Sequence, residues 1–231
     1  MAEQLDVSRV EEKYVISKLE ADRLYNKLKQ ILPGDDVNGY EAYTVRSLYF
    51  DSYHNDDYFD KLAGIKERKK IRVRIYDTTA DTAKLELKQK SGNNQRKQSL
   101  TITRDEADRL AKGDCEFLLK KNNELAKDIY YIFKKEVYLP KCIVEYKRRA
   151  FAIPTNNIRI TFDSEIASSE GNFDIFNPSL ALVYPVESRN KVVLEVKYNH
   201  FLLSYIKDAL SLCDATQESY SKYITARQYG L

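Results

Sequence analysis

Residues 66–77 read KERKKIRVRIYD, and charged and apolar side chains alternate along this stretch. The odd positions 71, 73 and 75 are β-branched and apolar, whereas the even positions carry Lys66, Arg68, Lys70, Arg72 and Arg74. Because successive side chains of a β-strand point to opposite faces, the pattern predicts a strand with one apolar and one cationic face. For a single strand, a cationic face that simply meets water is an equally good interpretation.

The same alternation recurs in at least five further segments with strand character. Their polar faces carry cations, carboxylates and uncharged polar groups, namely Arg9, Glu11 and Lys13; Lys84, Glu86, Lys88 and Lys90; Gln95, Lys97, Ser99 and Thr101; Arg159, Thr161, Asp163 and Glu165; and Glu195 and Lys197. About eight strands, mostly antiparallel, are predicted at 8–17, 43–52, 69–77, 83–90, 95–103, 141–153, 157–166 and 191–198. Helical patterns are predicted at 18–32, 56–64, most of 104–137, and 201–230.

Composition narrows the class of protein. The 231 residues carry a net charge of only +3 and are 43% hydrophobic, and we expect one domain over residues 1–231. Residues 61–104 nevertheless hold thirteen Lys or Arg against four Asp or Glu, which predicts a locally bound anionic partner. The three cysteines are scattered and there are only two histidines, so neither a disulfide framework nor a His-rich metal centre is indicated. The sequence lacks a signal-peptide pattern and an 18-residue apolar run, so we expect a cytoplasmic protein without membrane insertion.

Two architectures would accommodate so many charged strand faces. A two-layer sandwich would turn them outward into water. A closed barrel would instead place the apolar faces outward against helices and the charges inward around a wet lumen. About sixteen inward charges could not occupy a dry core, because each unpaired buried ion costs several kcal/mol. We therefore predict an α+β fold in which an eight-stranded antiparallel barrel encloses a hydrated, cationic tunnel.

Carboxylates on the same faces refine the expected ligand. Three Glu-x-Lys steps start at Glu11, Glu86 and Glu195, and each places an acid and a base on one face of a strand. Surfaces that bind duplex DNA usually carry cations alone, because carboxylates repel phosphate, so no nucleic-acid partner is expected. Mixed walls suit a metal–phosphate complex, in which carboxylates hold Mg²⁺ or Mn²⁺ and Lys or Arg hold the phosphoryl oxygens.

These motifs together resemble the CYTH, or triphosphate tunnel metalloenzyme, superfamily. More closely, EEKYVIS, VRSLYFDS, IRVRIYD, LELKQK, VEYKRRAF, IRITFDSEI, VVLEVKY and SKYI resemble the VTC domain, the catalytic domain of polyphosphate polymerases, from about residue 7 to residue 230. The resemblance implies a barrel with helices packed outside and a C-terminal helix at the tunnel. It also implies phosphate contacts from Lys13, Arg72, Arg74, Lys88, Lys97, Tyr146, Arg148, Arg159 and Lys222, to which the Glu-x-Lys pattern adds Lys197.

The resemblance further implies that Glu195 holds Mn²⁺ or Mg²⁺, with Glu11 or Glu86 assisting. Arg72, Arg74, Lys88 and Arg148 would then neutralise the triphosphate of ATP during transfer of its terminal phosphate to a growing polyphosphate chain. Two alternatives stay open: a tunnel tripolyphosphatase or nucleoside triphosphatase, in which water is the acceptor, and a non-catalytic polyanion-binding module. Nothing in the residue types decides the native metal, the product length or the oligomeric state.

In two respects the family pattern cannot be applied directly to this sequence. Within residues 145–149, Glu145, Lys147 and Arg149 alternate as well as Tyr146 and Arg148 do, so the inward set there is decided only by the resemblance. The inositol-phosphate-sensing SPX domain and the membrane segments of full-length eukaryotic members are not recognised in this sequence. Regulation or product export would therefore depend on a separate partner, such as a membrane protein.

Overall fold

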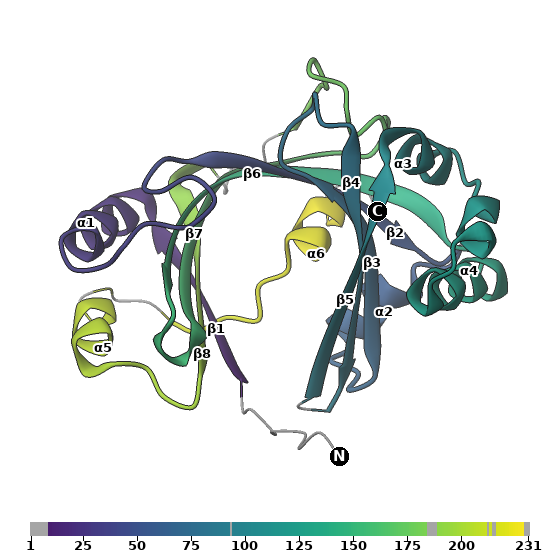
Figure 1. Ribbon diagram of the computed structural model, residues 1–231. Helices are drawn as coiled ribbons and strands as arrows, with labels where there is room; N and C mark the ends of the chain where they lie inside the picture. Colours follow the sequence, from purple (N-terminus) through teal and green to yellow (C-terminus); the bar gives the residue numbers. More distant parts are fainter. Residues whose placement is uncertain (1–8, 93, 184–188, 212, 214–215, 229–231) are drawn as a thin grey trace. The chain divides into compact units, whose positions relative to one another are not determined.

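The computed structural model describes residues 9–92, 94–183, 189–211, 213 and 216–228 (Figure 1). Its strands are β1 (Arg9–Ser17), β2 (Tyr43–Asp51), β3 (Arg68–Ile75), β4 (Thr82–Ser91), β5 (Asn94–Thr103), β6 (Leu139–Ile153), β7 (Ile158–Ser169) and β8 (Lys191–Asn199). Its helices are α1 (Lys18–Lys29), α2 (Asp56–Leu62), α3 (Arg104–Ala111), α4 (Glu124–Lys135), α5 (Ser204–Leu210) and α6 (Lys222–Arg227), with 3₁₀ helices η1 (Glu116–Lys120) and η2 (Thr155–Asn157).

The eight strands form one sheet in the order β1-β8-β7-β6-β2-β3-β4-β5. The pairs β1–β8, β7–β8, β2–β3, β3–β4 and β4–β5 are antiparallel, which confirms the predicted α+β class and the number of strands. The order begins at β1 and ends at β5, so hydrogen bonds between the described strands do not close the sheet into the predicted cylinder. On the outer edge of β1, Gln217 forms an isolated antiparallel bridge with Tyr14.

The described residues divide into two compact units. Unit 1 comprises the described residues within 1–44, 146–166 and 184–220, and unit 2 comprises those within 45–145, 167–183 and 221–231. Each unit has its own hydrophobic core. The prediction of a single domain over 1–231 stays a prediction.

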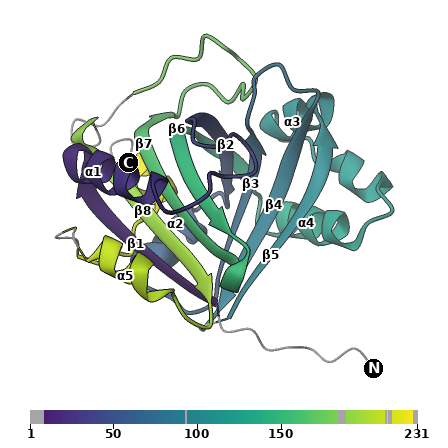
Figure 2. The same ribbon diagram turned by 60° about the vertical axis from the view of Figure 1, so that its left-hand side comes forward.

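In unit 1, helices cover one face of the strands. The amphipathic helix α1 starts at a capping box in which Ser17 and Glu20 satisfy each other's backbone N–H groups. Its apolar side buries Leu24 and Leu28 in a core shared with β7 and β8. Figures 1 and 2 show α5 beside α1 on the same side of these strands. Helix α1 ends at Lys29, three residues short of the predicted limit at 32.

In unit 2, the odd residues of β3 and β4 build the core against helices α3 and α4. Ile71, Val73, Leu85 and Leu87 are essentially inaccessible to solvent. The predicted helical stretch 104–137 is broken into α3, η1 and α4, because Gly113 adopts a positive φ of 83° that ends the first helix. Both α3 and α4 therefore lie on the apolar face, and the even residues of β3 and β4 are left on the opposite face (Figure 1).

No helix among the described residues has the length and the apolar character needed to cross a bilayer.

Candidate functional site

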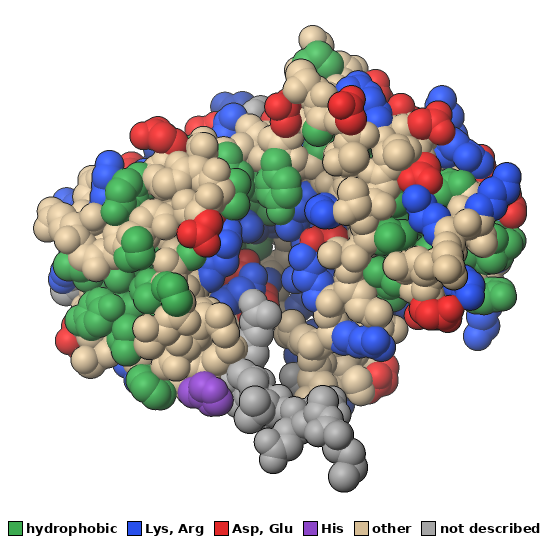
Figure 3. All heavy atoms as spheres, in the orientation of Figure 1, with side chains coloured by type: hydrophobic (Ala, Val, Ile, Leu, Met, Phe, Trp, Pro, Cys, Tyr) green, Lys and Arg blue, Asp and Glu red, His purple; other side chains and the backbone are tan. Residues whose placement is uncertain are grey.

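Unit 2 carries a cationic face, defined here as the side of β3, β4 and β5 opposite to α3 and α4. Register aligns Lys70 with Lys88 and Lys97 across the three strands. The neighbouring row aligns Arg72 with Glu86, and the next aligns Arg74 with Lys84. Figure 3 shows blue and red side chains gathered on this side of the strands. Eight cations lie on it, Arg68, Lys70, Arg72, Arg74, Lys84, Lys88, Lys90 and Lys97, against the single carboxylate of Glu86.

Glu86 organises the centre of the cationic face. Its Oε2 lies 2.6 Å from Nε of Arg72 and 3.8 Å from Nη1 of Arg74, and its Oε1 lies 2.5 Å from Nζ of Lys97. Burial alone would raise the pKa of the Glu86 carboxyl, but Arg72, Arg74 and the hydrogen bond from Lys97 outweigh it and lower the pKa to about 2. Glu86 is thus a permanent anion that holds three cations in place.

Strand β2 contributes two neutral groups that the sequence analysis missed. Tyr49 lies opposite Arg72 in register, and its hydroxyl accepts a hydrogen bond of 3.1 Å from Nη1 of Arg72. Ser47 lies opposite Arg74 and accepts a hydrogen bond of 3.2 Å from its Nε. Burial would raise the pKa of Tyr49, yet Arg72, Lys70 and Arg74 together lower it. The alternation of Ser47 and Tyr49 with the core residues Leu48 and Phe50 was the signal that could have found them.

The C-terminal helix α6 begins against this face. Nζ of Lys70 donates to Oγ of Ser221 at 3.1 Å and lies over the rings of Tyr49 and Tyr223. The two rings stack with centroids 5.2 Å apart, and the hydroxyl of Tyr223 donates to Oδ2 of Asp51 at 2.6 Å. Lys222, predicted from the resemblance, is the first residue of α6 and is half-buried.

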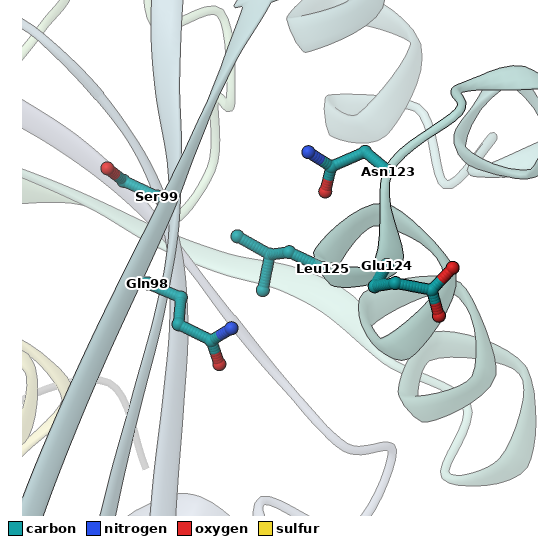
Figure 4. Close-up of a pocket in the computed structure, with 5 residues that line it drawn as sticks. All are labelled: Gln98, Ser99, Asn123, Glu124 and Leu125. Atoms are coloured by element: carbon teal, nitrogen blue, oxygen red, sulfur yellow. The ribbon is translucent and has the colours of Figure 1, made fainter. Parts of the chain in front are cut away.

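A surface pocket in unit 2 lies away from the cationic face. It is lined by Gln98, Ser99, Asn123, Glu124 and Leu125, at the junction of β5 with the start of α4. In Figure 4 Ser99 points away from the residues of α4, as expected for a side chain on the opposite face of β5 from Gln98. The pocket contains no cation, so it does not share the chemistry of the cationic face.

Unit 1 carries a second polar face, called the mixed face, on β1, β8, β7 and the second half of β6. Register places Glu11 opposite Lys197 and Lys13 opposite Glu195, so acids and bases are arranged as a checkerboard. Lys13 pairs with Glu11 at 3.1 Å, and Lys197 pairs with Glu195 and lies 3.9 Å from Glu11. Burial lowers the pKa of Lys197, and the neighbouring Glu195 and Glu11 offset this only in part.

Arg148 is held rigidly on the mixed face. It forms two hydrogen bonds, of 2.6 and 2.7 Å, with the fully buried carboxylate of Asp163 on β7. Burial opposes the charge on Arg148, but Asp163 outweighs it and raises the pKa of the guanidinium. Arg149 lies on the opposite face, over the ring of Tyr25 and 2.7 Å from Asp22 of α1. The even residues of 145–149 therefore share the polar face in unit 1, and Tyr146 lies under Arg148.

Arg159 is fixed by a partner outside the strands. Its guanidinium donates to both oxygens of Asp35, at 3.3 and 2.7 Å, and to the hydroxyl of Tyr43 at 3.1 Å. Tyr43 also donates to Asp35, and its burial, with a smaller effect of the nearby charges, raises its pKa to about 12. Asp35 follows Pro33-Gly34 in a connecting segment, where no periodic pattern marked it as part of a polar face.

The predicted site residues thus fall on two faces. The cationic face of unit 2 holds Arg72, Arg74, Lys88, Lys97 and Glu86. The mixed face of unit 1 holds Lys13, Tyr146, Arg148, Arg159, Lys197, Glu11 and Glu195. Lys222 belongs to unit 2 as the first residue of α6. Their roles in binding and catalysis stay predictions.

A divalent cation fits one of these faces better than the other. Among the described residues, no three Asp, Glu, His or Cys side chains are grouped to hold a metal ion. On the mixed face, however, Glu11 and Glu195 are diagonal neighbours that share the ammonium of Lys197. Hydrated Mg²⁺ or Mn²⁺ needs only one or two carboxylates, so this pair fits. Glu86 fits poorly, because three cations already surround it.

Comparison with solved structures defines the fold class. A protein from Hippeastrum, described as an adenylyl cyclase candidate with a dominant triphosphatase activity, matches with a TM-score of 0.57 at 12% identity over 96% of this chain and 97% of that chain. An adenylate cyclase candidate from Bacillus halodurans matches with a TM-score of 0.50 at 13% identity over 89% and 88%. At these identities the two matches show that this chain shares the fold of these proteins.

The family follows from the sequence model. The VTC domain model matches residues 8–230, nearly the whole chain, and the protein belongs to the VTC domain family. The resemblance stated from the motifs is confirmed. Comparison with curated proteins finds no significant match.

Proposed function

We propose that the protein is a metal-dependent polyphosphate polymerase that transfers the terminal phosphate of ATP to a growing polyphosphate chain. The observation that carries the proposal is the cationic face, where eight Lys or Arg meet one carboxylate on three adjacent strands. Membership of the VTC domain family supports the same assignment. A triphosphate presents repeated anionic oxygens, and rows of cations at strand spacing match them.

The residues of the cationic face would bind and orient the substrate. Arg72 and Arg74 present guanidiniums that are already fixed by Glu86, Tyr49 and Ser47, so little side-chain freedom is lost when phosphate binds. Phosphoryl transfer spreads negative charge over the equatorial oxygens, and preorganised cations stabilise that charge. Lys88 and Lys97 lie opposite each other on β4 and β5, in the row next to that of Arg72 and Glu86, and would contact further phosphates.

In this proposal the carboxylates of the mixed face hold the divalent metal ion. Glu195, with Glu11 beside it, would hold Mn²⁺ or Mg²⁺, and the bound ion would supply charge neutralisation to phosphoryl oxygens. Lys197 would move away from the two carboxylates when they bind a dication, since like charges repel. Arg148 and Arg159, each fixed by a carboxylate, would contact phosphate from this face.

Hydrolysis is the second candidate function. The structural neighbour from Hippeastrum has a dominant triphosphatase activity, and a hydrolase would use the same phosphate and metal contacts with water as the acceptor. The two activities differ only in their product, so one assay separates them.

The experiment incubates purified protein with ATP and either Mn²⁺ or Mg²⁺ and resolves the products on a gel. We expect long anionic chains, and about a hundredfold loss of chain synthesis in Arg74→Ala, because one preorganised charge at a transition state is worth about that factor. Glu195→Gln should lose activity at low metal concentration. Arg109→Ala, which removes a guanidinium on α3 paired with Asp114, is the matched control and should keep full activity.

The alternatives give different results in the same assay. Release of orthophosphate without formation of chains would show that the protein is a hydrolase, a tripolyphosphatase or nucleoside triphosphatase, and not a polymerase. Unchanged ATP, together with salt-sensitive polyphosphate binding that Glu195→Gln leaves intact, would identify a non-catalytic polyanion-binding module. Each variant must retain the cooperative thermal unfolding of the parent protein for its result to count.

A further inference from the structure

Thr161 is an unexplained polar group on the mixed face. It lies on β7 directly opposite Glu195 of β8, and only 2% of its surface is exposed. Its Oγ1 is buried and has no hydrogen-bond partner among the described residues. A buried hydroxyl without a partner costs free energy, so such a group in a native protein calls for an explanation.

The surroundings of Thr161 are otherwise well satisfied. Two residues before it, Arg159 is bound by Asp35, and two residues after it, Asp163 is bound by Arg148. The unpaired hydroxyl therefore does not reflect loose packing of the strand. Valine would fill the same volume without an unsatisfied group, and the adjacent core positions Ile160 and Phe162 show that β7 tolerates apolar residues.

The cross-strand neighbour of Thr161 is Glu195, the carboxylate of the proposed metal site. Cross-strand partners have Cβ atoms about 4.5–5.5 Å apart, so the side chains of Thr161 and Glu195 are direct neighbours on the mixed face. Mg²⁺ and Mn²⁺ bound by few carboxylates keep several waters, and each of these waters has hydrogens to donate. A hydroxyl oxygen accepts such hydrogen bonds.

We propose that Thr161 is a positioning residue for the dication of Glu195, with its Oγ1 accepting a hydrogen bond from a water in the hydration shell of the ion. The inference rests on the proposed function, because it requires that Glu195 holds a metal. Outer-shell partners of this kind typically change metal affinity by about ten- to a hundredfold. The hydroxyl would then be satisfied only in the metal-bound protein.

Direct binding of Mn²⁺, followed by electron paramagnetic resonance of the free ion, tests the inference without turnover. Thr161→Val should weaken Mn²⁺ binding about tenfold, whereas Thr161→Ser, which keeps the oxygen, should restore binding close to that of the parent. Thr44→Val is the matched control: this strand threonine already accepts a hydrogen bond of 2.7 Å from Lys147, and its loss should leave Mn²⁺ binding unchanged.

Thermal unfolding without metal adds an independent measurement. Because Thr161→Val removes an unsatisfied buried group, its midpoint without metal should equal or exceed that of the parent protein. The stabilisation that added Mn²⁺ gives should nevertheless be smaller in this variant. A variant that is intact without metal and poor at binding Mn²⁺ is the expected combination.

Three outcomes would overturn the inference. Equal Mn²⁺ affinity of Thr161→Val and the parent would show that the hydroxyl does not contact the hydration shell of the metal. If Glu195→Gln nevertheless lost Mn²⁺ binding, only the inference would fail and the proposed function would stand. If Thr161→Val bound Mn²⁺ as the parent does, but bound tripolyphosphate more weakly when a chelator had removed the metal, the hydroxyl would be assigned to phosphate instead. Absence of Mn²⁺ binding by the parent protein would remove both the inference and the metal role of Glu195.

Discussion

At Glu86, one carboxylate is shared by two guanidiniums and an ammonium, and it is nearly inaccessible to solvent. Removing one partner of such a cluster leaves the remaining charges facing each other without compensation. Glu86 therefore acts less as a ligand than as the anion that allows Arg72 and Arg74 to stand side by side. A triphosphate would add further negative charge next to cations that are already in position.

The titration of Glu86 gives a prediction at this scale. Its pKa falls from an ordinary 4.5 to about 2 in the folded protein, so the group stabilises the fold fully above pH 4.5. As the pH falls from 4.5 toward 2, the unfolded chain binds a proton that the folded protein does not, and up to about 3 kcal/mol of stability is lost. Glu86→Gln should flatten this part of the dependence of unfolding free energy on pH, measured by urea denaturation.

The control for this measurement is Glu124→Gln. Glu124 pairs with Lys127 on the exposed side of α4, where ion pairs contribute little. Its replacement should leave the slope below pH 4.5 as it is in the parent protein. If Glu86→Gln showed that same slope, Glu86 would not be the buried anion described here.

Among the elements, α6 stands out because a six-residue helix is too short to be stable by itself. It is held by tertiary contacts: the Tyr223 ring stacks on Tyr49, and the Tyr223 hydroxyl donates to Asp51. Asp51 also accepts from the backbone N–H groups of Ser52, Asp57 and Tyr58, so a single carboxylate joins the end of β2, the start of α2 and α6.

Tyr223→Phe tests this attachment. The substitution keeps the stacked ring but removes the hydrogen bond to a charged acceptor, and we expect a loss of about 1.5–3 kcal/mol in unfolding free energy. Amide exchange of residues 222–227 should become faster than that of the strands, and KM for ATP should rise more than kcat falls. Tyr205→Phe on α5, where the residue is 45% exposed, is the matched control and should change none of these values. Unaltered amide exchange in Tyr223→Phe would argue against the anchor.

For the whole molecule, binding of a polyanion should be linked to folding. Tripolyphosphate binds the folded cationic face and not the dispersed cations of the unfolded chain, so it should raise the thermal midpoint, by the equivalent of about 2.7 kcal/mol at a hundred times its Kd. Added salt should weaken the effect, because partly exposed cations such as Lys97 are screened. Sulfate at equal ionic strength is the control, and an equal shift with sulfate would contradict recognition of a triphosphate.

Much of this arrangement was predictable from the sequence, because period-two alternation fixes which side chains share a face. The strands and the cationic rows of 68–74 and 84–90 followed from it directly. Closure of the sheet did not follow, since alternation states nothing about which strands pair at the edges. Asp35 and Tyr43 were missed because their partner Arg159 is more than a hundred residues away. Alternation placed Thr161 on a polar face, but its unsatisfied hydroxyl can be recognised only in three dimensions.

The contacts of α6 also have a consequence for biosynthesis. Ser221 and Tyr223 follow all eight strands in the chain. A ribosome therefore synthesises Lys70 about 150 residues before its partner Ser221, and Tyr49 about 175 residues before its partner Tyr223. During that interval Lys70 lacks the contacts that Ser221 and Tyr223 give it in the folded protein. Docking of α6 onto β2 and β3 can therefore occur only after all eight strands have been synthesised.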